Sequence, residues 1–357
     1  MKKNDLKRFL HETLFGNVLN ILLAILLGFV VGAIALAIGG YNPIESYGKL
    51  FSVIFGSPRN LSYSFIEYAT PYILTGLSVA FSFSTGVFNI GAEGQYVMGS
   101  VAALLVGHFI KLPMILHIPL CMLAAAVAGG LWGMIVALLK QRFGANEILT
   151  MIMFNWIAYY FSNYVVNLKS VIAGQGQMWS KEIQESARIT LTSLTKVLSN
   201  KVHYGIVIAI VIALVINYVL NKTTFGFKLK AIGRNQHGAE YAGYDVKKGV
   251  LLTLIISGAL AGLAGGLQIM GVTYKITQFT GQEGYGFQGI TVALIGASNP
   301  IGVIFSGMFF GAMKFGGTRF KAPSEIVDII MGCIVLFIAI FAWIRTKALS
   351  IRKGEKQ

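Results

Sequence analysis

The chain has 357 residues, of which 55% are hydrophobic and only 12% are charged. Because soluble domains carry about a quarter charged residues, this composition excludes an ordinary soluble protein and indicates one embedded in a membrane. A net charge of +15 fits basic loops beside anionic lipid headgroups. Basic clusters interleaved with aromatic residues are missing, so we expect no nucleic-acid partner. The apolar segments predict a single transmembrane domain over residues 1–357, in contact with membrane lipid.

Ten apolar segments predict transmembrane helices, which need about 20 apolar residues to cross a bilayer. The first follows a basic N-terminus and is too long for a cleaved signal peptide, so we interpret it as an uncleaved span. Two short spans within 284–313 are separated by a turn at Ser298-Asn299-Pro300. The other spans cover 17–38, 69–84, 95–110, 118–139, 148–166, 204–220 and 249–272, and the last runs from about 323 to Arg345. The predicted fold is all-α and polytopic, with short broken helices.

The longest markedly basic loop covers residues 221–248 and holds six Lys or Arg residues but only two acidic residues. Basic loops between spans stay on the cytoplasmic side. With ten spans, this orientation places both termini in the cytosol as well. Residues 168–203 are rich in Ser, Thr and Gln and lack a continuous apolar run, so they predict an extracellular cap.

The strongest signal for a functional site inside an apolar region lies within residues 69–100. Asn89, Glu93 and Gln95 interrupt apolar stretches there, beside glycines that would break a helix. A carboxylate in the membrane is costly unless it faces protein or water, so Glu93 should point inward. Two interpretations stay open: Glu93 caps a half-helix, or it lines a path for a substrate, and one residue can do both.

A second polar and aromatic group lies between two apolar runs and comprises Glu283, Tyr285, Phe287 and Gln288. An aromatic ring beside an amide can stack on a base and hydrogen-bond a sugar, but such rings also form belts at the membrane surface. The pattern G-x-E-G occurs at 91–94 and again at 281–284. Glycine-interrupted segments in two halves of a chain can mark a transport site between repeats, although four residues can also recur by chance.

The sequence offers little for an enzyme. It contains no Walker A pattern, no G-x-S-x-G motif, and no pair with metal-site spacing among its five histidines. We therefore expect no catalytic residue, no metal site and no cofactor bound by this chain. Acidic residues at membrane depth leave open a secondary transporter or channel that acts without an ATPase, with Glu93 and Glu283 binding protons or ions.

Four segments carry a resemblance to a known family. They are TP-x-ILTGL with FNIGAEGQ in 70–95, RFGANEI at 142–148, AIGRNQHGAEYAGYDVKK at 231–248, and GYGFQGITVALIG at 284–296. Together they resemble the permeases of ABC importers for nucleosides that work with a lipoprotein of the basic membrane protein type. The resemblance to ribose and other simple-sugar permeases is more distant. It covers most of the chain except the termini and the predicted cap.

The resemblance implies that residues 221–248 are a coupling loop, which docks into a separate cytosolic ATPase that binds the ATP and Mg²⁺. The implied contact positions are Gly233, Asn235, Ala239, Tyr241, Ala242 and Gly243. Three neighbouring residues, Gln236, Gly238 and Tyr244, depart from those usual in the family. The resemblance also implies a second, homologous permease, a substrate-binding lipoprotein and a location in the plasma membrane.

The expected function is therefore that of the membrane-spanning permease subunit of an ATP-driven importer for nucleosides, related ribosides or simple sugars. The alternative is the ion-coupled or proton-coupled transporter or channel described above. The residues expected to line the substrate pathway are Phe88, Asn89, Glu93, Gln95, Glu283, Tyr285, Phe287 and Gln288.

Overall fold

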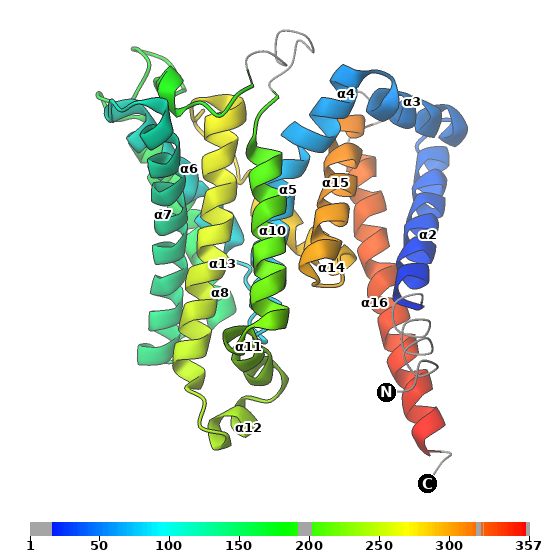
Figure 1. Ribbon diagram of the computed structural model, residues 1–357. Coiled ribbons are helices and arrows are strands. Elements are labelled where there is room, and N and C mark those ends of the chain that lie inside the picture. Colours follow the sequence, from blue (N-terminus) through cyan, green and yellow to red (C-terminus); the bar gives the residue numbers. More distant parts are fainter. Residues whose placement is uncertain (1–15, 192–201, 319–322, 324, 355–357) are drawn as a thin grey trace. The chain divides into compact units, whose positions relative to one another are not determined.

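A computed structural model describes residues 16–191, 202–318, 323 and 325–354 of the chain. Helices predominate in this part, and its β-structure is limited to isolated bridges, which confirms the predicted all-α class. The chain divides into two compact units, residues 1–53 with 316–357 and residues 54–315. Figure 1 labels their helices.

The smaller unit contains α2 (Gly16–Ile38), most of α3 (Pro43–Phe55) and α16 (Glu325–Gly354). α2 and α16 pack along each other, and Gly28 of α2 faces Ile334 of α16. A glycine at this contact lets the isoleucine side chain approach the α2 backbone closely. The Tyr47 hydroxyl of α3 donates a hydrogen bond to the Phe29 carbonyl of α2 over 2.6 Å. These contacts hold the three helices of the unit together.

The larger unit contains the other helices of the described residues. They are α4 (Pro58–Ser62), the π-helical turn η2 (Tyr63–Glu67), α5 (Ala69–Phe83), α6 (Ala92–Phe109), α7 (Met114–Phe143), α8 (Glu147–Val166), the 3₁₀ turn η3 (Glu185–Ala187), α10 (Gly205–Lys222), α11 (Thr224–Arg234), α12 (Gln236–Tyr241), α13 (Val246–Gln268), the π-helical turn η4 (Ile269–Thr273), α14 (Tyr285–Ile295) and α15 (Pro300–Gly317). Each apolar segment predicted as a span coincides with a helix, and α14 and α15 flank the predicted turn. The helices between 43 and 67 were not predicted.

Five helical segments of the described residues are long and apolar enough to cross a membrane. They are Leu19–Ile38, Met114–Phe143, Gly205–Lys222, Val246–Thr273 and Pro300–Gly317, while α14 is apolar but shorter. The chain is thus a membrane protein. The number of ten spans and the cytosolic termini stay predictions.

The core of the larger unit is built around α13. In its most apolar window 72% of the residues are buried, against 28% in α10 and 33% in α7, so α13 is central and the other two are peripheral. Gly262 of α13 lies against the backbone of α6 at Gly99 and that of α7 at Gly129. Small residues allow such close backbone approach between apolar helices, where dispersion contacts replace the hydrophobic effect as the driving force.

The segment between α8 and α10 covers one end of the larger unit, and α12 lies at the other end (Figure 1). The Gln184 amide donates to the Gly107 carbonyl of α6, and the Ile189 amide donates to the Met270 carbonyl of η4. Part of the predicted cap, residues 192–201, lies outside the described residues. The described part is irregular in backbone and tied to the helix ends below it.

His203, at the border between this segment and α10, is expected to make stability depend on pH. Burial lowers the pKa of His203 to about 4, whereas an unfolded histidine titrates near 6.5. The folded state binds fewer protons than the unfolded state between these two pH values. The free energy of unfolding is therefore highest above about pH 6.5 and falls by up to about 3 kcal/mol toward pH 4. Thermal unfolding of the purified protein between pH 7 and pH 4 should show this loss. A His203→Gln variant should flatten the profile relative to His108→Gln, and an unchanged profile would contradict the assignment.

Candidate functional site

The break between α5 and α6 is held by a buried polar network. The Asn89 side-chain amide donates to Gln95 Oε1 at 2.8 Å and to Ser257 Oγ at 2.6 Å, and all three side chains are buried. Ser257 in turn bonds the Ser78 carbonyl over 2.8 Å. The network therefore ties α5, α6 and α13 together. The Gln95 side-chain amide donates back to Asn89 Oδ1 at 3.2 Å, and neither residue lines the pocket described below.

Glu93 lies in the first turn of α6 and is only 1% exposed. Its carboxylate accepts hydrogen bonds from the Gly284 amide at 2.7 Å and from the Gly286 amide at 2.6 Å. These are backbone donors at the start of α14, where a helix leaves N–H groups unpaired and favours negative charge. Glu93 thus caps a half-helix that is 191 residues distant in sequence. It is not among the residues that line the pocket.

Asn155 of α8 supports the same break from the other side. Its side-chain oxygen accepts from the Gly94 amide at 2.8 Å, and its side-chain amide donates to the Ile90 carbonyl at 3.0 Å. Two backbone groups that the break frees are thereby satisfied by a side chain rather than by water. Phe88 stacks on Phe83 with ring centroids 5.4 Å apart.

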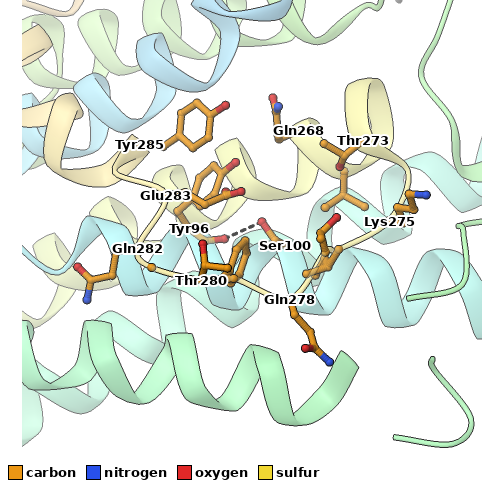
Figure 2. Close-up of a pocket in the computed structure, with 15 residues that line it drawn as sticks. Tyr96, Ser100, Gln268, Thr273, Lys275, Gln278, Thr280, Gln282, Glu283 and Tyr285 are labelled. Atoms are coloured by element: carbon orange, nitrogen blue, oxygen red, sulfur yellow. Dashed lines mark hydrogen bonds between the residues drawn. The ribbon is translucent and has the colours of Figure 1, made fainter. Parts of the chain in front are cut away.

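A pocket of about 410 Å³ lies between the first half of α6, the end of α13 with η4, and the loop that leads into α14. Figure 2 shows its lining side chains converging from α6, from α13 and η4, and from the loop that joins η4 to α14. Of the predicted pathway residues, Glu283 and Tyr285 line it, whereas Phe88, Asn89, Glu93, Gln95, Phe287 and Gln288 do not. The other polar or charged lining residues are Tyr96, Ser100, Gln268, Thr273, Lys275, Thr277, Gln278, Thr280 and Gln282.

Sequence reasoning missed most of this lining. Gln268 interrupts an apolar span, and residues 273–283 form a polar run between two apolar segments. Both features were readable signals, because polar groups at membrane depth line cavities or contact protein. The sequence could not show that the polar run turns back onto α6, since this depends on contacts with distant segments.

The loop 274–284 is held in place by side chains and backbone from other elements. Asn163 of α8 makes two hydrogen bonds with Phe279. Its side-chain amide donates to the Phe279 carbonyl at 3.0 Å, and its side-chain oxygen accepts from the Phe279 backbone amide at 2.8 Å. The Tyr159 hydroxyl donates to the same Phe279 carbonyl at 2.9 Å, and the Ile183 amide donates to the Tyr274 carbonyl at 2.9 Å. The pocket wall is therefore positioned before any ligand arrives.

An aromatic wall borders the pocket at the start of α14. The rings of Tyr96 and Tyr285 stack with centroids 5.1 Å apart, and Tyr72 packs on the other side of this pair at 5.3 Å from Tyr285. Two amide side-chain atoms of the lining, Gln268 Oε1 and Gln282 Nε2, are buried and have no hydrogen-bond partner among the described residues. An unpaired buried donor or acceptor costs about 1–3 kcal/mol, so the pocket is prepared for a polar ligand.

The predicted coupling segment forms two helices at the end opposite the cap. α12 begins at its N-cap Asn235, whose side-chain oxygen accepts from the Gly238 amide at 2.9 Å. Ala239 is buried, while Tyr241 is 95% exposed and Ala242 is exposed beside it. Gly243 follows with a φ of +79°, a conformation that glycine adopts without strain. The helix forms despite the unusual Gln236 and Gly238.

Gly233, near the end of α11, is exposed, and one side of it lies against the turn after α5. A Cβ atom at Gly233 would fall 2.9 Å from the amide nitrogen of Gly86 and close to the Ser84 carbonyl. Gly86 itself has a φ of +72° in the turn after α5. This contact joins the end of α11 to the break that contains Asn89. Of the six predicted coupling residues only Ala239 is buried, and Gly233 is the one that contacts the turn after α5.

Comparison with known proteins identifies the family. A family model described as branched-chain amino acid transport system / permease component matches residues 62–339. The guanosine ABC transporter permease protein NupP of Bacillus subtilis is 40% identical over 324 residues, covering 89% of this chain and 92% of that protein. A second guanosine permease protein of that organism, NupQ, is 31% identical over 254 residues, covering 69% of this chain and 78% of NupQ.

A sugar permease is also similar. The glucose ABC transporter permease protein TsgB13 of Haloferax volcanii is 30% identical over 328 residues, covering 88% of this chain and 85% of that protein. The match to the family model includes the break at 86–94, the polar pocket and the segment with α11 and α12, since all lie within residues 62–339. The chain therefore belongs to this family of transport-system permease components and is an ABC transporter permease, a transport subunit and not an enzyme.

Proposed function

We propose that the chain is the membrane-spanning permease subunit of an ATP-driven importer for nucleosides. The observation that carries this proposal is the polar pocket, whose aromatic wall and unpaired amides suit a ligand with both a flat ring and hydroxyl groups. The similarity to NupP, a guanosine permease by name, supports the same substrate class. The volume of the pocket, about 410 Å³, falls in the roughly 300–1,000 Å³ range of small-molecule pockets.

The importer that we propose contains several partners. A separate cytosolic ATPase binds ATP and Mg²⁺ and docks on α12 and its flanks, through Gly233, Asn235, Ala239, Tyr241, Ala242 and Gly243. A substrate-binding lipoprotein delivers the nucleoside from outside. A second, homologous permease completes the pathway, a proposal supported by the two similar guanosine permease proteins of one organism. The chain crosses the plasma membrane about ten times with both termini and residues 221–248 in the cytosol, and 168–203 outside.

The proposal is tested by reconstituting the permeases with their ATPase and lipoprotein in vesicles and measuring ATP-driven uptake of labelled guanosine. Unlabelled nucleosides should compete, while ribose, glucose and branched-chain amino acids should not. Competition by glucose alone would favour the sugar importer that the similarity to TsgB13 suggests. Competition by a branched-chain amino acid alone would likewise overturn the nucleoside assignment.

The alternative of a proton-driven transporter depends on acidic residues that exchange protons. Both carboxylate oxygens of Glu93 accept backbone hydrogen bonds from α14, so this residue has a structural task that argues against proton exchange. Uptake by this chain alone in vesicles with a proton gradient and no ATPase would establish the alternative. We expect none under these conditions.

Removing the ring of Tyr241 should weaken coupling without disturbing the fold. Its side chain is 95% exposed, so the folded chain itself gains little from it, whereas large exposed aromatic rings are frequent anchors of protein interfaces. We expect Tyr241→Ala to reduce ATP-driven uptake at least roughly tenfold, equivalent to about 1.4 kcal/mol of interface free energy, at an unchanged melting temperature. Tyr164→Ala, at an exposed tyrosine near the cap, is the matched control. Equal uptake by both variants would contradict a docking role for α12.

A further inference from the structure

Glu283 and Glu93 occupy the same position in the two G-x-E-G segments, but their surroundings differ. Both oxygens of Glu93 are engaged by backbone amides. Glu283 instead lines the pocket, and its side chain is exposed to the pocket space. Figure 2 shows it between Tyr96 and Tyr285, close to the Tyr96 ring. A carboxylate has about four acceptor positions, so Glu283 can accept a hydrogen bond from the Tyr96 hydroxyl and still accept hydrogen bonds from a ligand.

No basic side chain in the described part of the chain pairs with Glu283. The one lysine of the lining, Lys275, lies at the far end of the pocket in Figure 2. Its ammonium group sits 4.8 Å from the centroid of the Trp179 ring, a cation–π contact that holds it there. The Glu283 carboxyl group thus has no basic partner among the described residues that line the pocket.

The groups around Glu283 complete a site for hydroxyl groups. Gln268 of α13 offers a buried side-chain oxygen that can accept a hydrogen bond, whereas the side chain of Gln282 points away from Glu283 (Figure 2). The Gln268 oxygen has no partner among the described residues. A hydroxyl both donates and accepts, so a ligand with adjacent hydroxyls would satisfy the Glu283 carboxyl group and the Gln268 oxygen together.

Glu283 is also held in a defined position. The next residue, Gly284, is fixed by the hydrogen bond that its backbone amide donates to the Glu93 carboxylate and by a φ of +84°, which glycine adopts without strain. Four residues earlier, Phe279 is paired with Asn163. A carboxyl group on a loop that is already held in place loses little conformational freedom when a ligand binds. More of the free energy of its hydrogen bonds is then available to discriminate between ligands.

Resting on the proposed nucleoside import, we infer that Glu283 accepts hydrogen bonds from the vicinal 2′ and 3′ hydroxyls of a ribose in this pocket. The two oxygens of one carboxyl group match two adjacent hydroxyl groups. A site built to bind a hydroxyl rejects an analogue that lacks it, because its own polar groups then stay unpaired. The permease thereby selects ribosides itself, in addition to any selection by the lipoprotein.

The test compares guanosine with 2′-deoxyguanosine and 3′-deoxyguanosine in the reconstituted complete importer. The same lipoprotein is present in every arm, so its own preference cancels when variants are compared with wild type. We expect Glu283→Gln to reduce guanosine uptake roughly tenfold and to change uptake of the two deoxy compounds much less, because they already lack one of the hydrogen bonds. The preference for the riboside should fall by the same factor.

Two further variants separate recognition from folding. Glu283→Asp keeps the carboxylate and should retain part of the riboside preference. Glu182→Gln, which alters an exposed acid paired with Arg188 on the outer segment, should match wild type. Equal loss for guanosine and both deoxy compounds in Glu283→Gln would show a structural role and overturn the inference, as would an unchanged preference. If the wild-type importer carries a sugar or an amino acid but no nucleoside, the proposed function itself fails.

Discussion

Replacing Glu93 with alanine is expected to destabilise the assembled complex strongly and to abolish transport. The change leaves the Gly284 and Gly286 amides without acceptors in a buried region. Each unpaired buried amide costs about 1–3 kcal/mol, and the start of α14 also loses a favourable negative charge, so the total loss should be at least about 2 kcal/mol. Transport should fail because α14 and the loop before it carry Tyr285 and Glu283 into the pocket.

The measurement is the melting temperature of the purified complex together with ATP-driven uptake. Glu93→Gln provides a graded case, because its side-chain oxygen can keep one of the two backbone bonds, and it should lie between wild type and Glu93→Ala. Glu182→Gln removes a charge from an exposed ion pair and should change stability by less than about 1 kcal/mol. A Glu93→Ala complex with wild-type melting temperature and uptake would show that the contact is dispensable.

Introducing a single methyl group at Gly233 is expected to uncouple ATP hydrolysis from uptake. The added Cβ would meet the backbone at Ser84 and Gly86, which cannot move aside as a flexible side chain can. Overpacking of this kind costs about 1–3 kcal/mol and shifts the local backbone. Since α12 begins three residues later at Gln236 and remains exposed, the ATPase should still dock. We expect Gly233→Ala to reduce uptake at least tenfold, which corresponds to a free-energy change of roughly 1.4 kcal/mol, while ATP hydrolysis continues.

Gly238→Ala is the matched control for this prediction. Its Cβ would meet only the Asn235 side chain, at 3.3 Å, and alanine is the better helix former by up to about 1 kcal/mol. The variant should therefore keep both uptake and ATP hydrolysis. Equal uptake by Gly233→Ala and wild type would show that the contact with the turn after α5 takes no part in coupling.

The two predictions concern neighbouring parts of one chain of contacts. Gly233 touches the turn at Gly86, Asn89 follows three residues later in the buried network, and Glu93 holds the start of α14. These contacts connect α11 and α12 with the wall of the pocket. Contact alone does not establish coupling. Combining Gly233→Ala with Glu93→Gln in a double-mutant cycle on uptake would measure it, and independent sites should give additive effects.

The positions of helices and breaks were largely readable from the sequence. Apolar runs of sufficient length predicted the helices, because only a closed backbone hydrogen-bond pattern is stable among apolar surroundings. Asn89, Glu93 and Gln95 marked the break between α5 and α6 for the same reason. The short helices at 43–67 were missed because they are less uniformly apolar and are interrupted by Ser57 and Pro58.

The sequence by itself determined a membrane protein of one family, its helices, and the polar residues that had to face protein or a cavity. Only the tertiary structure decided which of these polar residues are structural and which line the pocket. Glu93 and Glu283 sit in the same four-residue pattern, yet Glu93 binds the backbone of α14 while Glu283 faces the pocket. The reason is physical: the number of donors that reach a carboxylate depends on the approach of segments 191 residues apart, which no local pattern encodes.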